Sequence, residues 1–429
     1  MICISEKYDT RITNLDGYKP KFMEWGIINK ENFKSIQEVP IKRWDPLSTI
    51  QIAEDEFGLH KKLTRYYGRY SYLSPIRGQR PIHFKVKDFD SEGDLYESSK
   101  KVMKEIKDVF MGITEGKAIY DEEGNLIGDG NTIIITEDEK RRDLPFSDKP
   151  HRIESVPDTC KAMTLINRYP SMARIIDPDI KLSIEKELPP KSLLSMGINL
   201  VSISRHFYPS FCFELIPKDV LAGIFLSMKE AILYCILESI ERDYYDIPIN
   251  IFFNIGTKVG GSQPRIHGQV YIDLNGDGHG VRLEGYLRAF KEMGDNCRLC
   301  ESTHGERERM VMETKYWTFY ATGSPVRNYH LRFYPKEHIR RFDQLKSNQI
   351  QDLAKSLKII FKALDDMGVE KNRNVLFNCC PYGYDANFHM FAEIIPFETI
   401  GGAEMADDMR VARKLPEDSA REIRNAISP

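Results

Sequence analysis

Apolar and polar positions follow one order of elements twice in the later part of the chain. Residues 162–174 and 198–206 predict strands, residues 217–244 predict a long amphipathic helix, and residues 248–274 predict strand, glycine-rich turn and strand. The same order returns in residues 316–325, 328–339, 349–369 and 375–396. We therefore expect a two-fold repeat of about 130 residues, each part with an antiparallel sheet and a packing helix.

The earlier part of the chain is less regular. Residues 45–58 and 69–89 predict strands, and residues 96–113 have helical spacing. Residues 117–138 alternate around Gly and Asn, which predicts a β-hairpin. The charged, proline-containing stretch 137–152 indicates a boundary near residue 150.

These patterns predict an α+β fold in three parts. The charge cluster at 137–142 is expected to be a solvated turn next to the first boundary. The three parts are a β-rich N-terminal extension (residues 1–150), a first half (residues 151–285) and a second half (residues 286–429).

Composition narrows the class of protein. The 429 residues are enough for two or three domains, and 41% are hydrophobic, which allows a sizeable core. With 61 Lys+Arg against 64 Asp+Glu, the chain has no basic surplus for general nucleic-acid binding. No apolar run approaches a membrane span, and the N-terminus lacks the apolar core of a secretory signal. Eight scattered cysteines are no disulfide framework, so we expect a cytoplasmic protein.

The stretch GGSQPRIHGQVY contains a candidate nucleophile, His267. A lone histidine on a strand is more often structural than catalytic, but its neighbours favour chemistry. Gly260 and Gly261 allow close approach of a phosphate and can present N–H groups to it. Ser262 adds a hydroxyl donor, and Gln269 lies on the same strand face as His267. A nucleophile among fixed donors is what phosphoryl or nucleotidyl transfer requires.

The motif N-x-G-x4-G-S-x-P-x-x-H-G-Q, from Asn254 to Gln269, resembles the active-site segment of the galactose-1-phosphate uridylyltransferase family, a branch of the histidine-triad superfamily. Three later stretches resemble the second half of that family in the same order. They are CRLCE…GERERMVMETKYW, YHLRFYPKEHI and FHMFAEIIP…GGAEMADDMRVARKLPEDSAREIR. The resemblance covers roughly residues 155–429, with RWDPLS as a faint match before it. It implies two histidine-triad-like halves.

The resemblance implies a nucleotidyltransferase that moves a nucleoside monophosphate between a nucleotide sugar and a sugar 1-phosphate. His267 would form a covalent nucleotidyl-histidine in the first of two in-line displacements. Gln269 and Ser262 would contact the phosphates. The residues implied near the nucleoside are Asn167, Tyr169 and Asn254. The family also implies a homodimer.

Two alternatives stay open. One is a phosphorylase of the same superfamily, which cleaves a nucleotide sugar or a dinucleoside polyphosphate with inorganic phosphate. The other is a non-catalytic nucleotide-binding protein. The partners expected are a nucleotide sugar and a sugar phosphate, with no nucleic acid and no membrane.

Cys297 and Cys300 form a C-x-x-C that alone fits a redox pair, half of a zinc knuckle or unrelated thiols. By resemblance, His338 and His389 fall at metal positions of the family. The four residues imply a closed, structural Zn2+ site in the second half. Two competing ligands stay open, and they are His304 and His330.

The first half departs from the family pattern. Arg265 stands where the family has a metal-ligating histidine, and His206 would be a lone ligand, so we expect no metal there. Arg265 supplies a fixed charge, binds a phosphate, or is an exposed arginine in a surface salt bridge. In the second half Phe391 takes the place of His267, which indicates one catalytic and one supporting half. Glu393 on the same strand face is structural or binds metal.

The segment GGAEMADDMR resembles the one that reaches the sugar hydroxyls, in part across a dimer interface. Glu404 matches the acidic residue that accepts hydrogen bonds from hydroxyls, and its alternative role is a helix-entry carboxylate. Ala403 replaces the usual aromatic residue, and Arg410 stands where a glutamine is common. These changes leave the identity of the sugar open. Arg410 is counted among the expected binding residues.

Overall fold

The structure is a computed structural model, and its described residues are 27–28, 30, 33, 35–52, 65–80, 132–137, 140–142, 161–167, 169–173, 175–276, 278–301, 307–384 and 386–427. The predicted helix at 96–113, the first strand of the hairpin in 117–131 and the boundary near residue 150 lie outside them.

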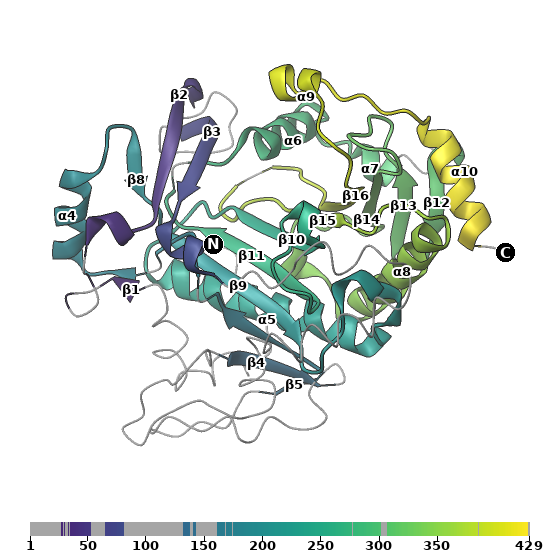
Figure 1. Ribbon diagram of the computed structural model, residues 1–429, viewed down its shortest axis with the longest axis horizontal. Coiled ribbons are helices and arrows are strands. Elements are labelled where there is room, and N and C mark those ends of the chain that lie inside the picture. The colour runs from purple at the N-terminus through teal and green to yellow at the C-terminus, as the bar shows by residue number, and fades with distance from the viewer. Residues whose placement is uncertain are drawn as a thin grey trace.

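One large antiparallel sheet runs through the described part of the molecule (Figure 1). Its strands are β4 (Thr132–Glu137), β5 (Lys140–Arg142), β6 (Ala162–Ile166), β9 (Gly197–Ser204), β10 (Ile249–Ile255), β11 (His267–Asp273), β12 (Met310–Glu313), β13 (Trp317–Ala321), β14 (Leu331–Pro335), β15 (Arg373–Asn378) and β16 (Phe391–Pro396). They lie in the order β12-β13-β14-β16-β15-β10-β11-β9-β6-β4-β5.

Strands β10 and β15 form the central pair of this sheet, with Phe252 opposite Leu376. Outward from this pair the strands follow the same chain order on both sides. One side runs β10, β11, β9, β6, and the other runs β15, β16, β14, β13. The strands predicted for the repeat are therefore confirmed. They could be predicted because apolar and polar residues alternate along a strand as its side chains alternate between the two faces of the sheet.

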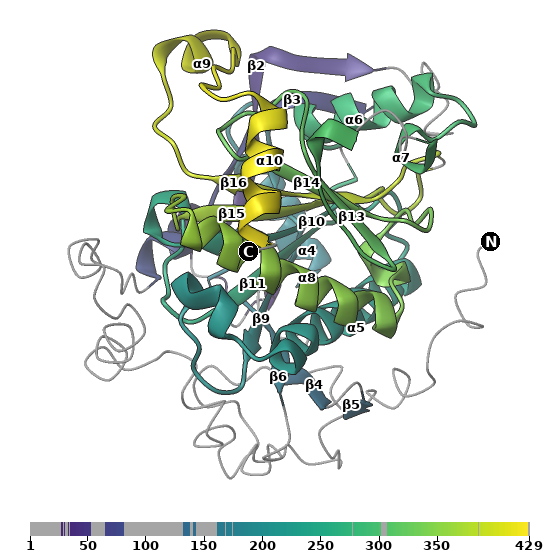
Figure 2. The same ribbon diagram turned by 90° about the vertical axis from the view of Figure 1, so that its right-hand side faces the viewer.

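Two long helices cover one face of the sheet, as Figure 2 shows. They are α5 (Lys218–Glu241) and α8 (Ser347–Asp366), and both match predicted helices. Phe225 of α5 packs edge-to-face on Phe253 of β10 and Phe377 of β15, with ring centroids 5.5 and 5.9 Å apart. Contrary to the expectation, α5 is long and apolar enough to cross a membrane, but 83% of its most apolar window is buried, as in a core helix.

Smaller elements complete the described fold. The strands β2 (Ile41–Ile52), β3 (Arg65–Leu73) and β8 (Ser192–Leu194) form a three-stranded sheet, and β1 (Ile27–Ile28) pairs with β7 (Ile175–Ile176). The other helices are α4 (Pro178–Glu187), α6 (Val281–Glu292), α7 (Arg298–Glu301), α9 (Gly402–Asp407), α10 (Pro416–Ile427), and the 3-10 turns η3 (Ile36–Glu38), η4 (Pro75–Gln79), η7 (Ser210–Leu215), η8 (Thr257–Val259), η10 (Arg307–Arg309) and η11 (Phe342–Gln344).

Two smaller expectations have clear outcomes. The cluster at 137–142 is more than a turn, because Glu137 of β4 and Lys140 of β5 are register partners in two antiparallel strands. The six described cysteines form no disulfides, as their spacing indicated.

Candidate active site and metal centre

Strand β11 begins at His267, and its alternation decides which side chains reach the face opposite α5. A Cβ on Gly268 would lie 2.4 Å from Met228 Cε and 2.7 Å from Phe253 Cζ, so Gly268 packs against α5 without room for a side chain. His267 and Gln269 therefore point to the opposite face, as their spacing predicted. Both are almost fully buried, with 6% and 7% of their surface exposed.

The imidazole of His267 is held in one tautomer. Its Nδ1 lies 2.8 Å from the backbone oxygen of Arg265. Because a carbonyl only accepts, Nδ1 carries the proton and Nε2 keeps its lone pair. Burial lowers the pKa of His267, the hydrogen bond to Arg265 acts in the opposite direction, and the charge of Arg80 lowers the pKa further. His267 is thus a neutral imidazole at pH 7, with the lone pair of Nε2 unprotonated.

A glycine loop connects β10 to β11. Gly256 and Gly260 have φ values of 94° and 90°, and a Cβ on Gly261 would lie 2.6 Å from the oxygen of Gly256. Gly260 donates its N–H to Thr257 O and Gly261 donates to Gly256 O, at 3.1 and 2.9 Å. The expectation that Gly260 and Gly261 present N–H groups to a phosphate is therefore wrong, because the loop already uses both donors. The two glycines shape the turn that carries half-buried Ser262.

Residues from the second half fix this loop. Asn374 Nδ2 donates to Asn254 Oδ1 at 2.8 Å. Asn372 Oδ1 accepts from the backbone N–H of Lys258 at 3.1 Å, and the Lys258 ammonium pairs with Glu370 at 2.8 Å. The expected site is therefore built across the β10–β15 junction.

The turn at Asn167 and Tyr169 meets the N-terminal segment. Asn167 Oδ1 accepts the Tyr169 N–H at 2.9 Å, which closes the turn. Arg77 of η4 donates from Nη1 to Tyr169 O at 3.1 Å, and Ser74 Oγ donates to Pro170 O at 2.9 Å. The turn is thus joined to η4.

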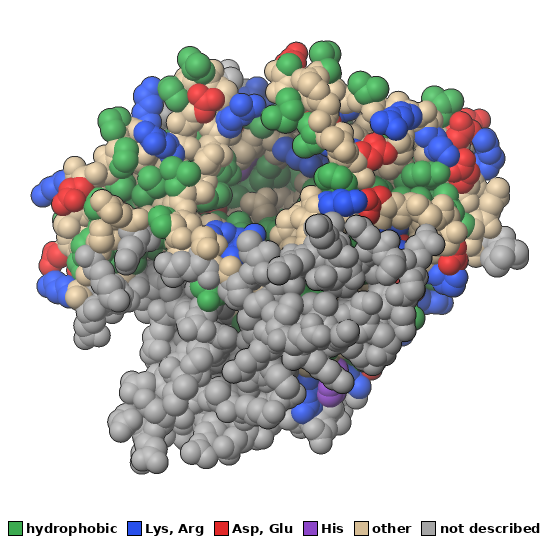
Figure 3. Space-filling view, viewed as in Figure 1, with side chains coloured by type: hydrophobic (Ala, Val, Ile, Leu, Met, Phe, Trp, Pro, Cys, Tyr) green, Lys and Arg blue, Asp and Glu red, His purple; other side chains and the backbone are tan. Residues whose placement is uncertain are grey.

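Two arginines of this N-terminal segment were missed by the sequence reasoning. The Arg77 guanidinium lies 5.9 Å from the ring of Tyr271, two residues after Gln269 on β11. The charge of Arg80 acts on His267, and Arg80 itself interacts electrostatically with Tyr271. The i, i+3 spacing of two arginines beside Pro75 was the available signal, since residues three apart in a 3-10 turn lie on one side. The described surface is hollowed between the β2–β3 side and the α9 side, with Lys and Arg on the rim (Figure 3).

A buried ion pair anchors the N-terminal strands to β11. The Lys42 ammonium of β2 lies 3.0 Å from Asp273 Oδ2, and these side chains are 0% and 4% exposed. Tyr72 of β3 donates its hydroxyl to the same oxygen at 2.5 Å. The rings of Trp44 and Tyr70 lie 5.0 and 4.3 Å from the ammonium. The two ends of β11 are therefore His267 and this anchor.

Arg265 is buried, with 4% of its surface exposed. Its Nη1 donates to Ser204 O at 2.7 Å and to Arg205 O at 3.0 Å, at the end of β9. The hypothesis of an exposed arginine in a surface salt bridge is therefore wrong, because the group is enclosed and bonds to backbone carbonyls. His206, which follows these carbonyls, is exposed.

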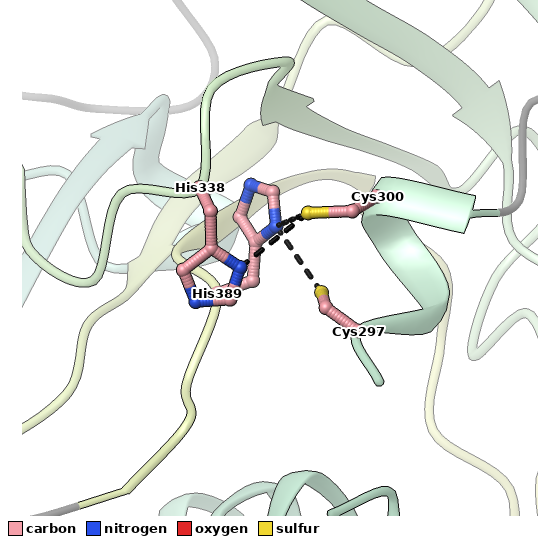
Figure 4. A group of neighbouring side chains, drawn as sticks. All are labelled: Cys297, Cys300, His338 and His389. Carbon is pink, nitrogen blue, oxygen red and sulfur yellow. Dashed lines mark hydrogen bonds between the residues drawn. The ribbon is translucent and has the colours of Figure 1, made fainter. Parts of the chain in front are cut away.

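The four expected metal ligands converge in the second half (Figure 4). Ligand atoms of Cys297, Cys300, His338 and His389 all lie within 4.8 Å of one another. The Nδ1 atom of His389 lies 3.4 Å from both thiol sulfurs, and His338 Nδ1 lies 3.4 Å from Cys300 Sγ. The competing candidate His304 lies outside the described residues.

This donor set fits zinc. Tetrahedral Zn2+ with bonds of about 2.3 Å to sulfur and 2.05 Å to nitrogen separates the two ligand atoms by about 3.6 Å, close to the distances found. His389 Nε2 contacts Pro335 O at 2.7 Å, which leaves Nδ1 to face the thiols. Desolvation and the neighbouring Cys297 raise the pKa of Cys300 to about 12, so metal binding would release protons.

His330 and Glu393 form an ion network instead of a metal site. His330 Nδ1 accepts from Val326 N at 3.2 Å, and its Nε2 lies 3.2 Å from Glu393 Oε1. Arg332 donates to the same carboxylate at 3.0 Å, and Arg282 pairs with it as well. These partners outweigh burial and hold the pKa of Glu393 well below its usual range. His330 as a competing ligand and Glu393 as a metal ligand are therefore wrong.

Comparisons with known proteins show what this chain is similar to. No protein-family model matches the chain. The galactose-1-phosphate uridylyltransferase of Thermotoga maritima is 24% identical over 290 residues, which cover 63% of this chain and 86% of the relative. That of Haemophilus influenzae is 25% identical over 145 residues, or 33% and 42% of the two chains. The chain is a relative of the galactose-1-phosphate uridylyltransferases.

Several solved structures share the fold of this chain. A uridylyltransferase structure has a TM-score of 0.52 at 20% identity, covering 62% of this chain and 85% of its own. An ADP-glucose phosphorylase from Arabidopsis thaliana, solved with ADP-glucose, has a TM-score of 0.53 at 18% identity, covering 88% and 99%. At these identities the likeness shows fold alone, and it confirms the mixed α and β class with a large antiparallel sheet.

Glu404 and Arg410, placed by resemblance to the uridylyltransferases near the sugar, contact each other. Glu404 lies in the first turn of α9, where its carboxylate accepts from Arg327 Nη1 at 2.8 and 3.0 Å and pairs with Arg410. Ala403 is exposed on the same helix. The helix-entry position and the double arginine pairing are structural facts, and contact with a sugar stays a proposal.

Proposed function

We propose that the chain is a nucleotidyltransferase that moves a nucleoside monophosphate between a nucleotide sugar and a sugar 1-phosphate through a covalent nucleotidyl-histidine at His267. One observation carries the proposal. A neutral, buried imidazole has its Nδ1 proton committed to a carbonyl and its Nε2 lone pair left for attack, beside the cation of Arg80. Relationship to named uridylyltransferases supports the reaction class.

The reaction balances with His267 alone as the nucleophile. In the first step Nε2 forms a bond to the α-phosphorus, the bond from phosphorus to the bridging oxygen breaks, and a sugar 1-phosphate leaves. In the second step an oxygen of the incoming sugar 1-phosphate attacks phosphorus, and the N–P bond breaks to restore the neutral ring. While the ring is bonded to phosphorus it is cationic, and the carbonyl of Arg265 stabilises that charge.

The remaining side chains would hold the substrate around this reaction. Guanidinium groups and amides placed before the reaction stabilise the phosphoryl oxygens without reorganising. The side chains assigned to the phosphates are Ser262 of the loop shaped by Gly260 and Gly261, Gln269 of β11, and Arg77 and Arg80 of the η4 segment. Those assigned to the nucleoside are Asn167, Tyr169 and Asn254.

We propose a structural zinc ion on Cys297, Cys300, His338 and His389. When bound there, zinc supplies a cross-link between α7 and the segments that follow β14 and precede β16. With four protein ligands the ion would have no open position, so the reacting phosphate depends on His267 and its neighbours.

We further propose that residues 151–285 and 286–429 are two histidine-triad-like halves and that residues 1–150 are an extension attached to the first half. The equal strand order on both sides of β10 and β15 supports the halves. Three apolar residues in and after α9, Met405, Met409 and Val411, are 71%, 55% and 75% exposed, which favours a homodimer. Free cysteines and no disulfide among the described residues fit a cytoplasmic location.

A second candidate function is the phosphorylase reaction, with inorganic phosphate as the acceptor. One observation favours it. The carboxylate assigned to the sugar, Glu404, is already paired with Arg327 and Arg410, and guanidinium groups are suited to phosphate.

The test is to incubate the protein with UDP-, ADP- and GDP-linked sugars, quench, and weigh the intact chain. We expect a gain of one nucleoside monophosphate, lost in His267→Ala and kept in His206→Ala, an exposed histidine of the same half. Adding a sugar 1-phosphate or inorganic phosphate to the adduct then separates transferase from phosphorylase by which acceptor removes the nucleotide. Binding of nucleotide without an adduct from any donor would favour the non-catalytic hypothesis.

A further inference from the structure

Arg265 and His389 occupy corresponding places in the sheet. Each stands two residues before its strand begins, at His267 of β11 and Phe391 of β16. Each is buried, with 4% and 0% of its surface exposed. Each strand also has an equivalent neighbour, because β11 pairs with β9 and β16 pairs with β14, antiparallel in both cases.

The two side chains also make the same backbone contact. His389 Nε2 contacts Pro335 O at 2.7 Å, and Pro335 is the last residue of β14. Arg265 Nη1 donates to Ser204 O at 2.7 Å, and Ser204 is the last residue of β9. In both places a buried side chain therefore joins the entrance of one strand to the end of its neighbour.

Beyond this shared contact the two places differ. The other ring nitrogen of His389 faces two thiols, where a metal ion would complete the junction. The guanidinium of Arg265 instead makes a further bond to Arg205 O at 3.0 Å and lies 5.7 Å from the ring of Phe207. One planar guanidinium with several donors thus makes the connections that an imidazole and a metal ion would make together in the second half.

We infer that Arg265 is a positioning residue that replaces both the ligand and the cation of a metal centre in the first half. Its side chain fixes the β9–β11 junction, and its carbonyl, held by that junction, orients the imidazole of His267. The inference rests on the proposed role of His267. It predicts that the orientation of the nucleophile depends on Arg265 and is independent of metal.

The charge of Arg265 and its planar, multi-donor guanidinium geometry (the fork) can be tested separately. Arg265→Met removes both, and Arg265→Lys keeps the charge without the fork. Arg373→Met is the matched control, because Arg373 is equally buried and donates to the carbonyls of Val369 and Glu370 in the second half.

In single-turnover mass measurements, we expect adduct formation at His267 to slow about 100-fold in Arg265→Met, with a change of less than about 3-fold in the Kd of the nucleotide sugar, because a small misplacement of a nucleophile costs rate. Arg265→Lys should recover part of the loss, to about 10-fold below wild type. Arg373→Met should lower the unfolding temperature and keep the rate within about 2-fold. A wild-type rate in folded Arg265→Met, or in Arg265→Lys if the Met variant does not fold, would overturn the inference.

A second readout does not depend on catalysis. Long-range 15N–1H NMR spectra report the tautomer of each histidine, and His267→Gln assigns the signal. We expect one Nδ1–H tautomer in wild type, before and after chelation of metal, and a mixture in Arg265→Met. An unchanged tautomer in Arg265→Met would contradict the inference, whether or not wild type forms an adduct. The absence of an adduct in wild type would count against the proposed function alone.

Discussion

The N-terminal ends of β11 and β16 (their entrances) have the same backbone arrangement but different side chains. At β11 the first and third residues are His267 and Gln269, at β16 they are Phe391 and Glu393. Phe391 packs against the ring of Tyr286 at 4.8 Å, within a cluster of aromatic side chains. The same strand position therefore holds a hydrogen-bonded imidazole in one half and a packed aromatic ring in the other, and we propose that only the first reacts.

The charges differ as well. Glu393 is fully buried and is satisfied by Arg282, Arg332, His330 and Asn378, so its cations are committed within the protein. Near His267 the charge of Arg80 lowers the pKa of the ring, and we assign this arginine to the substrate phosphates. The second half uses its polar groups for stability, and the first half is proposed to use them for a ligand.

The largest effect should come from substituting the first residue of β11 and of β16. We expect His267→Gln to reduce turnover by on the order of 10⁴-fold, because no other nucleophile takes its place. Phe391→His should create no second adduct, because the buried Glu393 carboxylate two residues away would repel a phosphate there. Steady-state turnover and peptide mapping check both, and a nucleotide on position 391 would contradict the comparison.

The metal centre should be separable from the chemistry. Cys300→Ser should abolish stoichiometric zinc and lower the unfolding temperature by roughly 10 °C, while the adduct at His267 still forms below that temperature. Since the pKa of Cys300 is raised to about 12 without metal, zinc uptake at pH 7 should release protons, seen as buffer-dependent heat in calorimetry. Cys212→Ala, outside the centre, should keep the metal.

The anchor of the N-terminal strands should matter for stability. Lys42→Met leaves Asp273 buried and unpaired, and we expect a loss of about 3–5 kcal/mol in the free energy of unfolding, measured by denaturant titration. Adding Asp273→Asn should restore part of it, because the uncompensated charge is removed. Equal loss in the single and double variants would mean that packing of Lys42, and not its charge, holds the strands.

The smallest effect concerns pH. His267 must be neutral to attack, and its pKa lies below the ordinary 6.5, so the acid limb of kcat/KM should fall below pH 6.5. Arg80→Gln removes a charge that lowers this pKa, so the limb should move up by a few tenths of a pH unit. Arg43→Gln, an exposed arginine of β2, is the control. A limb that stays in place or moves down in Arg80→Gln would contradict the placement of Arg80.

Much of the repeat could be predicted because each strand has one face on the core. The alternation around Phe253 and His267 fixed β10, β11 and their order, and the apolar spacing of residues 217–244 fixed α5. The convergence of Cys297, Cys300 and the two histidines also came from spacing and resemblance.

What could not be predicted depends on contacts distant in sequence. Burial of Arg265 follows from the end of β9, and the partners of Glu393 come from α6, β14 and β15. The engaged N–H groups of Gly260 and Gly261 follow from the φ angles of the loop. The effect of Arg80 on His267 depends on contacts that hold the N-terminal elements near β11, among them Lys42–Asp273 and Arg77–Tyr169.

The most direct test of one reactive and one metal-binding entrance is native mass spectrometry of the chain after exposure to a nucleotide sugar. The account predicts one zinc ion and one nucleoside monophosphate per chain, with only the nucleotide lost in His267→Ala and only the zinc lost in Cys300→Ser. Loss of both groups together in either variant, or two metal ions in wild type, would contradict it.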